Sequence, residues 1–536
     1  MSVANNQYDY IIVGAGSAGC VLANRLSEDA GVKVLLLEAG GKDSHPLIHI
    51  PLGVGKVYKK RMFDWGYDSE PEPNLQSRKV DAMRGKVLGG SSSVNVMGYS
   101  RGSATDYDRW SRTAPGWSYK EVLPYFKKAE TFEDGPSETR GGEGPLGVSW
   151  SRTTDPIFDS WRKAAVAAGY KINPNLTGGD PEGFGTNQWT VRNGRRSSTA
   201  NAYLRPVMKR KNLTVQTHAH VTRVVLEGTR ARGVEYVRNG QTISATAGRD
   251  VILSGGTFNT PQLLMLSGIG PSAHLNELGI KIAADLPVGE NLQDHLTVVN
   301  FYRRNDQGEM HRELRADRMA FHMLRAWLFR SGFATRIPTG FLGFVKTQTG
   351  LSEPDILLLF LVTPPYAGLW YPGRPYQDAF GVRPVLLHPK SRGRILLRSA
   401  NPMDHMRIHY NFFSEPEDIA TLRTGFKRGR DLAREAAMNF HRGVETTPGE
   451  KVQSDAEIDD YIRRTALTMH HPCGTCKMGE DSAAVIDRNM RVRGIEGLRV
   501  VDASVMPDLV SGSINACVIM IAEKAADIIR GKKLHS

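Results

Sequence analysis

Cysteine and long apolar runs are the two features that this sequence most clearly lacks. Only four cysteines occur in 536 residues, which is too few for the disulfide framework of a small secreted domain. The longest apolar runs, Ile356–Val362 and Ala516–Ala522, span seven residues each, whereas a membrane-spanning helix needs about 20. The first apolar strand begins within ten residues of Met1, which leaves no room for a signal peptide. We therefore expect a cytoplasmic protein without a transmembrane segment, and the length indicates more than one domain.

A dense tract of one charge sign is also absent. Lysine and arginine outnumber aspartate and glutamate by 69 to 56, which gives a formal net charge of +13. The basic residues are dispersed, however, and the densest clusters, such as Lys59–Arg61 and Lys209–Lys211, are short. We expect no nucleic-acid partner, because such surfaces gather lysine and arginine on one face. The positive net charge leaves peripheral association with an anionic membrane surface open.

The beginning of the chain carries a glycine-rich loop between two strand patterns. Tyr10–Val13 is a short β-branched run that predicts a buried strand, and Gly14–Gly19 reads G-x-G-x-x-G. A helical pattern and a second apolar strand, Val34–Leu37, follow before Glu38. The glycines allow a tight turn, close approach of backbone N–H groups to a pyrophosphate, and close packing of helix on strand. Glu38 can accept both ribose hydroxyls, so the segment predicts binding of an ADP-containing dinucleotide, NAD or FAD.

Two later segments are also rich in glycine and small residues. Arg84–Trp110 contains Gly-Gly followed by three serines and an asparagine, a run rich in hydrogen-bond donors that could hold a second part of a large phosphate-bearing ligand. Val251–Gly270 predicts a strand that ends in Gly-Gly, followed by a helix that starts near Thr260-Pro261, since proline suits the first turn. Taken singly, each segment could be an ordinary loop.

The segment Met469–Gly479, MHHPCGTCKMG, allows several interpretations. Cys473 and Cys476 form a CxxC after two histidines, which suggests a metal site or a redox dithiol. A structural zinc site needs four ligands, and a second CxxC is absent. A neutral histidine can instead act as a base near physiological pH. From the residues alone these interpretations stay open, and a structural histidine before Pro472 is one of them.

Together, these segments resemble the glucose–methanol–choline (GMC) oxidoreductases, and most of all their bacterial alcohol and choline dehydrogenases. The matching segments are GKVLGGSSSVNVMGYSRGSATDYD, GGTFNTPQLLMLSGIG, DLPVGENLQDH, HPCGTCKMG and LRVVDASVMPDLVSGSINACVIMIAEKAADII. The resemblance implies an α/β (α+β) fold, in which a Rossmann-like FAD-binding domain is interleaved with a substrate domain built on an antiparallel sheet with helices. We expect the FAD domain to comprise residues 1–45, 84–110, 215–300 and 465–536. Residues 46–83, 111–214 and 301–464 would bind the substrate and cover the flavin.

Residue by residue, the resemblance also implies a site. His471 would take the hydroxyl proton of an alcohol, and Asn515 would hold the alcohol oxygen as a hydrogen-bond donor. His470 would point away from His471, and we expect no metal at the CxxC. The expected FAD-binding residues are Gly14, Gly16, Ser17, Ala18, Gly19, Glu38, Ala39, Trp65, Arg84, Val87, Gly89, Gly90, Ser91, Asn95, Gly98, Val221, Asp502, Ala503 and Asn515. The start of the helix at Asn515 would favour an anionic reduced flavin through its dipole.

The sequence departs from some relatives in ways that shape the expected chemistry. Val94 stands where some members carry a histidine bonded to FAD, so we expect non-covalent FAD. Gly340 aligns with a glutamate that holds the cation in choline-type enzymes, so we expect a primary alcohol other than choline, with aromatic alcohols as candidates. Phe344, Phe360, Tyr366 and His471 would contact it. The alcohol would become an aldehyde by hydride transfer to flavin N5, with a quinone, another carrier or dioxygen as electron acceptor. A flavin-containing lyase of the same fold is the alternative.

Overall fold

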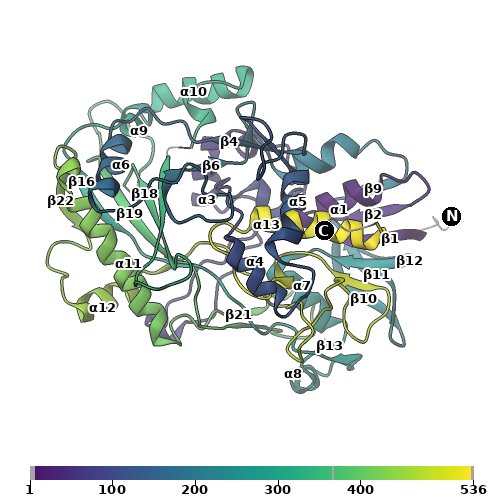
Figure 1. Ribbon diagram of the computed structural model, residues 1–536. Helices are drawn as coiled ribbons and strands as arrows, with labels where there is room; N and C mark the ends of the chain where they lie inside the picture. The colour runs from purple at the N-terminus through teal and green to yellow at the C-terminus, as the bar shows by residue number, and fades with distance from the viewer. Residues whose placement is uncertain (1–6, 338, 365–366, 533–536) are drawn as a thin grey trace.

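Two large β-sheets, each assembled from segments far apart in the sequence, organise the protein (Figure 1). The computed structural model describes residues 7–337, 339–364 and 367–532. The first sheet has seven strands: β10 (His220–Glu227), β11 (Arg230–Arg238), β12 (Gln241–Leu253), β1 (Gln7–Val13), β2 (Val34–Leu37) and β9 (Leu213–Gln216), in that order, with β24 (Leu498–Val500) beside β12. β1 pairs in parallel with β2 and β12, as expected for a dinucleotide-binding sheet.

Glycines bring the first helix close to this sheet. Gly14 follows β1 with a φ of +97°, and a Cβ there would lie 2.5 Å from the carbonyl oxygen of Ser254. Helix α1 (Ser17–Leu26) begins three residues later. A Cβ on Gly19 would lie 1.8 Å from the Gly14 carbonyl oxygen. Both positions therefore require glycine, because the turn and the packing of helix on strand leave no room for a side chain.

The C-terminal helix α13 (Asn515–Ile529) lies beside α1, so the two ends of the chain meet (Figure 1). The contact includes an ion pair between Arg25 and Glu523, with Nη2 and Oε1 2.7 Å apart, and Tyr203 also donates to Glu523. The Glu523 side chain is fully buried. Lys128 Nζ lies 3.2 Å from the other carboxylate oxygen of Glu523, so two cations balance this buried charge.

The second sheet has eight strands, and all its strand pairs are antiparallel. Its strands are β22 (Arg442–Thr447), β16 (Asn300–Arg304), β19 (Ala379–Leu386), β18 (Ile356–Leu361), β17 (Phe341–Val345) and β5 (Gly183–Thr186), with β15 (Leu296–Thr297) and β23 (Leu467–Thr468) at the end of β19. Helix α11 (Pro416–Arg434) packs on β18 and β19. Gly425 and Gly429 permit this approach, because a Cβ at either position would lie within 3.0 Å of a side chain of the sheet.

Helix α7 (Gly256–Leu266) begins earlier than its sequence predicts. The prediction placed its start near Thr260-Pro261, but the helix starts at Gly256 and Pro261 lies inside it. Proline cannot donate a hydrogen bond to the carbonyl four residues before it, here that of Thr257. The hydroxyl of Thr475 donates to this carbonyl instead, at 2.6 Å, and the Thr257 hydroxyl donates to the Pro472 carbonyl at 2.7 Å. The segment MHHPCGTCKMG is thereby fixed against α7.

The remaining elements are short or peripheral. The other helices are α2 (Pro46–His49), α3 (Val54–Lys59), α4 (Ala104–Ser111), α5 (Tyr119–Ala129), α6 (Ile157–Ala167), α8 (Ser272–Glu277), α9 (Glu309–Glu313), α10 (Ala316–Phe329) and α12 (Asp455–Thr465). The small sheets pair β3 (Glu130–Phe132), β4 (Leu146–Trp150) and β6 (Gln188–Trp189), then β7 (Val191–Arg192) with β8 (Arg195–Arg196), β13 (Ile269–Gly270) with β14 (Ala284–Asp285), and β20 (Arg394–Leu396) with β21 (Arg407–His409). Among the helices of the described residues, none combines the length and hydrophobicity needed to cross a bilayer.

The predicted fold class, a mixed α/β protein with a Rossmann-like first sheet and an antiparallel second sheet, is confirmed. The strands of the first sheet fall in residues 7–37, 213–253 and 498–500. Those of the second sheet fall in residues 183–186, 296–386 and 442–468. The domain boundaries themselves remain a prediction.

Candidate active site

A cavity of about 460 Å³ extends from the glycine loop after β1 to the face of the second sheet. Its wall includes most of the residues that the sequence singled out. They are Gly14, Gly16, Ser17, Ala18, Glu38, Ala39, Trp65, Arg84, Gly90, Ser91, Asn95, Gly98, Val221, Asp502, Ala503, Asn515, His471 and Phe344. Val94 and Gln188 also line this cavity.

Three of the expected FAD-binding residues do not line the cavity. Gly19 lies behind the loop, packed against Gly14. Gly89 donates its N–H to the Ala15 carbonyl at 2.7 Å, so it shapes the loop that the neighbouring residues present. Val87 is buried in a separate apolar cluster with Ile48 and others. These three residues therefore support the wall of the cavity, and their contact with FAD remains a prediction.

The substrate predictions need a correction. Phe344 lines the cavity from β17. Phe360 does not, because it is buried in the core and stacks on Trp161 with ring centroids 4.4 Å apart. Its strand alternates sides, so Phe360 faces away from the cavity while Leu359 and Leu361 line it. Tyr366 lies outside the described residues.

The nucleotide end of the cavity suits the ADP part of FAD. Glu38 accepts hydrogen bonds from the N–H groups of Ala15 and Gly40 at 2.9 and 2.8 Å. Burial raises the pKa of Glu38 to about 7, although these N–H donors favour its charged form. Ser254 Oγ is buried without a partner among the described residues, and it lies on the cavity wall. Such an atom can be satisfied by a polar ligand.

Asn515 begins α13 and is held by the nucleotide-binding loop. The Ser17 hydroxyl donates to Asn515 Oδ1 at 2.7 Å. Because this bond occupies the carbonyl side of the amide, the Nδ2 hydrogens are the part that can be donated to a ligand. The positive end of the helix dipole adds to this preference for an electron-rich oxygen.

His471 forms an unusual contact with a second histidine. Its Nδ1 lies 2.9 Å from Nδ1 of His295, and His295 Nε2 lies 3.1 Å from the Leu387 carbonyl oxygen. Since a carbonyl only accepts, His295 carries its proton on Nε2, and its Nδ1 must accept from His471. His471 therefore carries its proton on Nδ1, and Nε2 holds the lone pair. Asp294 Oδ1 accepts the His471 backbone N–H at 2.8 Å and fixes the backbone.

Four histidines line the cavity, and three of them, His295, His470 and His471, concern the chemistry of this site. Burial lowers the pKa of His295 and His470 to about 3. The pKa of His471 is held well below its usual value by burial first and then by the nearby His295, Arg84 and His470. All three rings are therefore neutral near pH 7, which a base must be to accept a proton.

His470 differs from the expectation that it points away from the cavity. Its backbone adopts a φ of +59°, so the chain is not extended here and successive side chains do not alternate sides. His470 Nε2 lies 3.3 Å from the Tyr58 hydroxyl, and Arg84 donates to the His470 carbonyl at 2.8 Å. His470 therefore links the wall to Tyr58 on α3.

The cavity wall also carries aromatic and basic side chains. Tyr58, Trp189 and Phe344 supply aromatic rings. Arg383 Nε is buried and has no hydrogen-bond partner among the described residues, and burial lowers the pKa of Arg383. No motif or pattern in the sequence pointed to Tyr58, Trp189 or Arg383. His295 ended the DLPVGENLQDH segment, so its position was visible but its contact with His471 was not.

Both cysteines of the CxxC are buried and unoxidised. Cys473 and Cys476 are free thiols, and burial raises the pKa of each well above its usual value. A thiol that stays protonated is a poor metal ligand and a poor nucleophile. Their surroundings thus favour a packing role.

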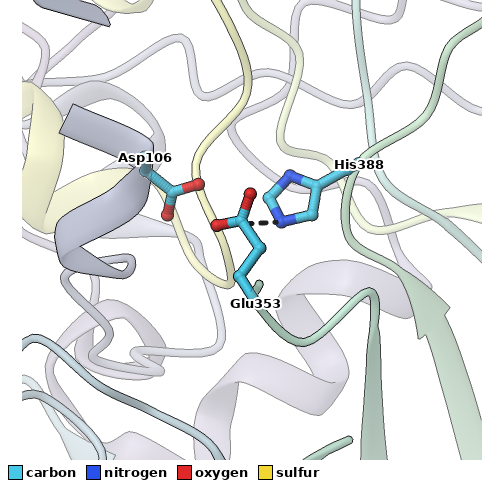
Figure 2. A group of neighbouring side chains, drawn as sticks. All are labelled: Asp106, Glu353 and His388. Atoms are coloured by element: carbon cyan, nitrogen blue, oxygen red, sulfur yellow. Dashed lines mark ion pairs between the residues drawn. The ribbon is translucent and has the colours of Figure 1, made fainter. Parts of the chain in front are cut away.

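Away from the cavity, Asp106, Glu353 and His388 gather at one point (Figure 2). Arg109 already pairs with both carboxylates. Its guanidinium lies 2.8 Å from Asp106 Oδ1, pairs with Glu353 through Nη1, and lies 2.7 Å from Asp508 Oδ2. We therefore assign this group as an ion-pair network that joins α4 to the second sheet and to the loop before α13.

Comparison with known proteins gives the same family for both parts of the chain. The GMC oxidoreductase models match residues 8–297 and 389–522. The chain is 45% identical to the mitochondrial choline dehydrogenase of Mus musculus, over 99% of this chain and 90% of that protein. It is 41% identical to the oxygen-dependent choline dehydrogenase of Rhizobium etli, over 98% and 96%. The formate oxidase of Aspergillus oryzae, solved in a study of its FAD modification, superposes with a TM-score of 0.91 at 29% identity, over 98% of both chains.

These relatives overturn one expectation. The sequence predicted an alcohol other than choline, because Gly340 stands where a glutamate was expected. Proteins that match nearly the whole chain at 41% and 45% identity are named choline dehydrogenases, so that expectation is wrong. The error came from treating one aligned position as decisive, although aromatic rings can also hold a quaternary ammonium group.

The cofactor and the type of reaction follow from the family. GMC oxidoreductases bind FAD, and the cavity offers the glycine loop, Glu38 and the start of α13 to hold it. The protein is an FAD-dependent oxidoreductase that acts on CH–OH donors. The chain belongs to the GMC oxidoreductase family.

Proposed function

We propose that this enzyme oxidises choline, or a closely similar primary alcohol, to the aldehyde, with His471 as the base. The observation that carries the proposal is the hydrogen bond between the Nδ1 atoms of His295 and His471, at 2.9 Å. In that bond His471 donates the proton on its Nδ1, so its Nε2 keeps a lone pair. The lowered pKa of His471 keeps the ring neutral. His471 can then remove the hydroxyl proton.

The other residues would position the alcohol. Asn515 donates from Nδ2 to the alcohol oxygen, since Ser17 occupies its Oδ1. A donor aimed at an oxygen that gains negative charge stabilises the transition state more than the ground state. Bound FAD supplies the hydride acceptor. We further propose that the FAD is non-covalent, because Val94 on the cavity wall offers no nucleophile at the position expected for a covalent link.

Aromatic rings would bind the trimethylammonium group. Tyr58, Trp189 and Phe344 line the cavity, and rings attract a cation by about 0.5–2 kcal/mol. Trp189→Leu should raise the KM for choline by about 2- to 30-fold. It should change the KM for 3,3-dimethyl-1-butanol much less, because that alcohol has the same shape without the charge. Equal changes for both substrates would mean that Trp189 contributes shape alone.

Anaerobic flavin bleaching tests the reaction itself. Choline should bleach the holoenzyme, and His471→Gln should slow bleaching by about 10²–10⁴-fold. His322→Gln is the matched control, because His322 lies on α10 and pairs with Glu313 outside the cavity. If neither choline nor any other alcohol bleaches the flavin, the proposal is wrong. Readmitting air then separates dioxygen from a carrier such as a quinone as electron acceptor, because only an oxidase regains its colour quickly.

A further inference from the structure

Helix α10 (Ala316–Phe329) stands at the edge of the molecule, at the top of the view in Figure 1. One of its faces is packed. Met323 and Ala326 contact Ile50, Leu52 and Ala334, which form a small apolar cluster beneath the helix. The helix is therefore anchored to the body of the protein by an inward apolar stripe.

The opposite face of α10 is also apolar, and it is exposed. Phe321, Leu324 and Leu328 are spaced by three and four residues and are 58%, 57% and 57% exposed, and Phe329 is 73% exposed. A helix that is apolar on both sides normally has a partner on each. We call these four residues the outer face of α10.

A neighbouring loop extends this exposed apolar area. Leu369 and Tyr371 are both exposed, and Trp370 between them forms a β-bridge with Arg315, directly before α10. Soluble proteins rarely leave large aromatic and aliphatic side chains exposed together without an interaction partner.

The outer face is surrounded by positive charge. Residues 312–336 contain six arginines and two acidic residues. No carboxylate of the described chain lies within ion-pair distance of Arg325 or Arg330. Arg195 contributes as well, since its guanidinium lies over the Trp327 ring at 5.1 Å. Burial and then the nearby charges of Arg330 and Arg205 lower the pKa of Arg195, so positive charge is concentrated here.

We propose that the outer face of α10 docks onto the surface of an anionic lipid bilayer. Helices that lie in a membrane interface combine exposed large apolar side chains with flanking arginines in this way. A second copy of the chain fits less well. A two-fold contact through α10 would bring Arg325 and Arg330 near the same residues of the other copy, and like charges repel.

Docking would place the membrane next to the wall of the cavity. Ile50 and Leu52, beneath α10, lead directly into α3, and Val54 and Tyr58 of that segment line the cavity. At its other end, α10 leads to Thr339, which lines the same cavity. A lipid-soluble electron acceptor could thus approach the cavity along this side of the protein.

Co-sedimentation of the holoenzyme with vesicles tests the docking surface. The enzyme should bind phosphatidylcholine vesicles that contain phosphatidylglycerol and should bind pure phosphatidylcholine vesicles weakly. The double variant Arg325→Gln with Arg330→Gln should bind these vesicles about 30-fold more weakly, because each arginine contributes about fivefold. Phe321→Glu with Leu328→Glu should weaken it at least as much. Phe440→Glu is the matched control, since Phe440 is as exposed as Phe329, at 73%, but lies before β22.

Three results would overturn the proposal. One is a wild-type enzyme that fails to bind anionic vesicles, and another is a Phe440→Glu variant that loses binding as much as the α10 variants. The third combines two observations: the wild type does not bind vesicles, and the α10 variants sediment as monomers where the wild type sediments as a dimer. That result would assign the surface to a second copy of the chain. Retained flavin absorbance shows that each variant is folded. Brominated lipids give a test that needs no acidic variant, because they should quench wild-type fluorescence more than that of Trp327→Phe.

Discussion

Replacing His295 with alanine would remove the group that accepts the Nδ1 proton of His471, at 2.9 Å in the native protein. The donor would then be buried without a partner, at a cost of about 1–3 kcal/mol. His471 can avoid this cost by moving its proton to Nε2, which is the atom that must accept the proton of the alcohol. The active tautomer should therefore become rarer, and flavin reduction by choline should slow by about 10- to 100-fold. The KM should change little, because His295 is not expected to touch the alcohol.

His295→Asn separates this effect from a general loss of packing. The Oδ1 atom of asparagine can occupy the place of His295 Nδ1 and accept the same hydrogen bond, so most of the rate should return. The assay is the rate of anaerobic flavin bleaching after rapid mixing, measured across pH at saturating choline. An alanine variant that reduces its flavin at the native rate would refute the assigned tautomer. So would an asparagine variant as slow as the alanine variant.

Other properties should also respond in defined directions. The cavity histidines are neutral in the folded state but titrate near pH 6.5 when unfolded. The contribution of these histidines to the free energy of unfolding should thus be complete above about pH 6.5 and should fall as the pH drops toward about 3. Each histidine should lower the free energy of unfolding by up to about 1.4 kcal/mol for each pH unit. An unchanged melting temperature down to about pH 4.5 would contradict this. Arg383→Met removes a positive charge from the wall, so the KM for choline should fall several-fold while that for 3,3-dimethyl-1-butanol stays constant. Alanine at both Cys473 and Cys476 should keep turnover but lower stability by about 1–3 kcal/mol, and loss of turnover with a bound metal would restore the metal interpretation. Acid precipitation should leave colourless protein and yellow supernatant if FAD is non-covalent.

Local signals in the sequence were sufficient to predict the strands and the glycine loop at the nucleotide end of the fold. β2 has the bounds that its apolar run predicts, Val34–Leu37. The glycine loop after β1 could be predicted because the positive φ of Gly14 and the close contact of Gly19 with the Gly14 carbonyl are local features. The start of α7 could not, because Pro261 is tolerated only through Thr475, which is more than 200 residues away.

In the site, too, local features could be predicted from the sequence and features that depend on distant residues could not. Histidine before proline in a known motif identified His471, but its protonation depends on His295, 176 residues earlier. Phe360 was misassigned because an apolar run does not reveal which of its members faces the cavity and which faces the core. The left-handed backbone of His470 likewise has no signature in the sequence, since glycine and asparagine are the usual residues there.

The meeting of the chain's two ends has a consequence for biosynthesis. β24 and α13 complete the first sheet and the packing on α1, and both are made from the last part of the chain. A ribosome adding about 5–20 residues per second would release them roughly half a minute to two minutes after β1. Throughout that interval the glycine loop lacks Asn515 and Arg25 lacks its partner Glu523. We therefore expect flavin to bind only after synthesis ends. A nascent chain stalled before Leu498 would lack β24 beside β12, and we expect it to depend on chaperones to protect the incomplete sheet.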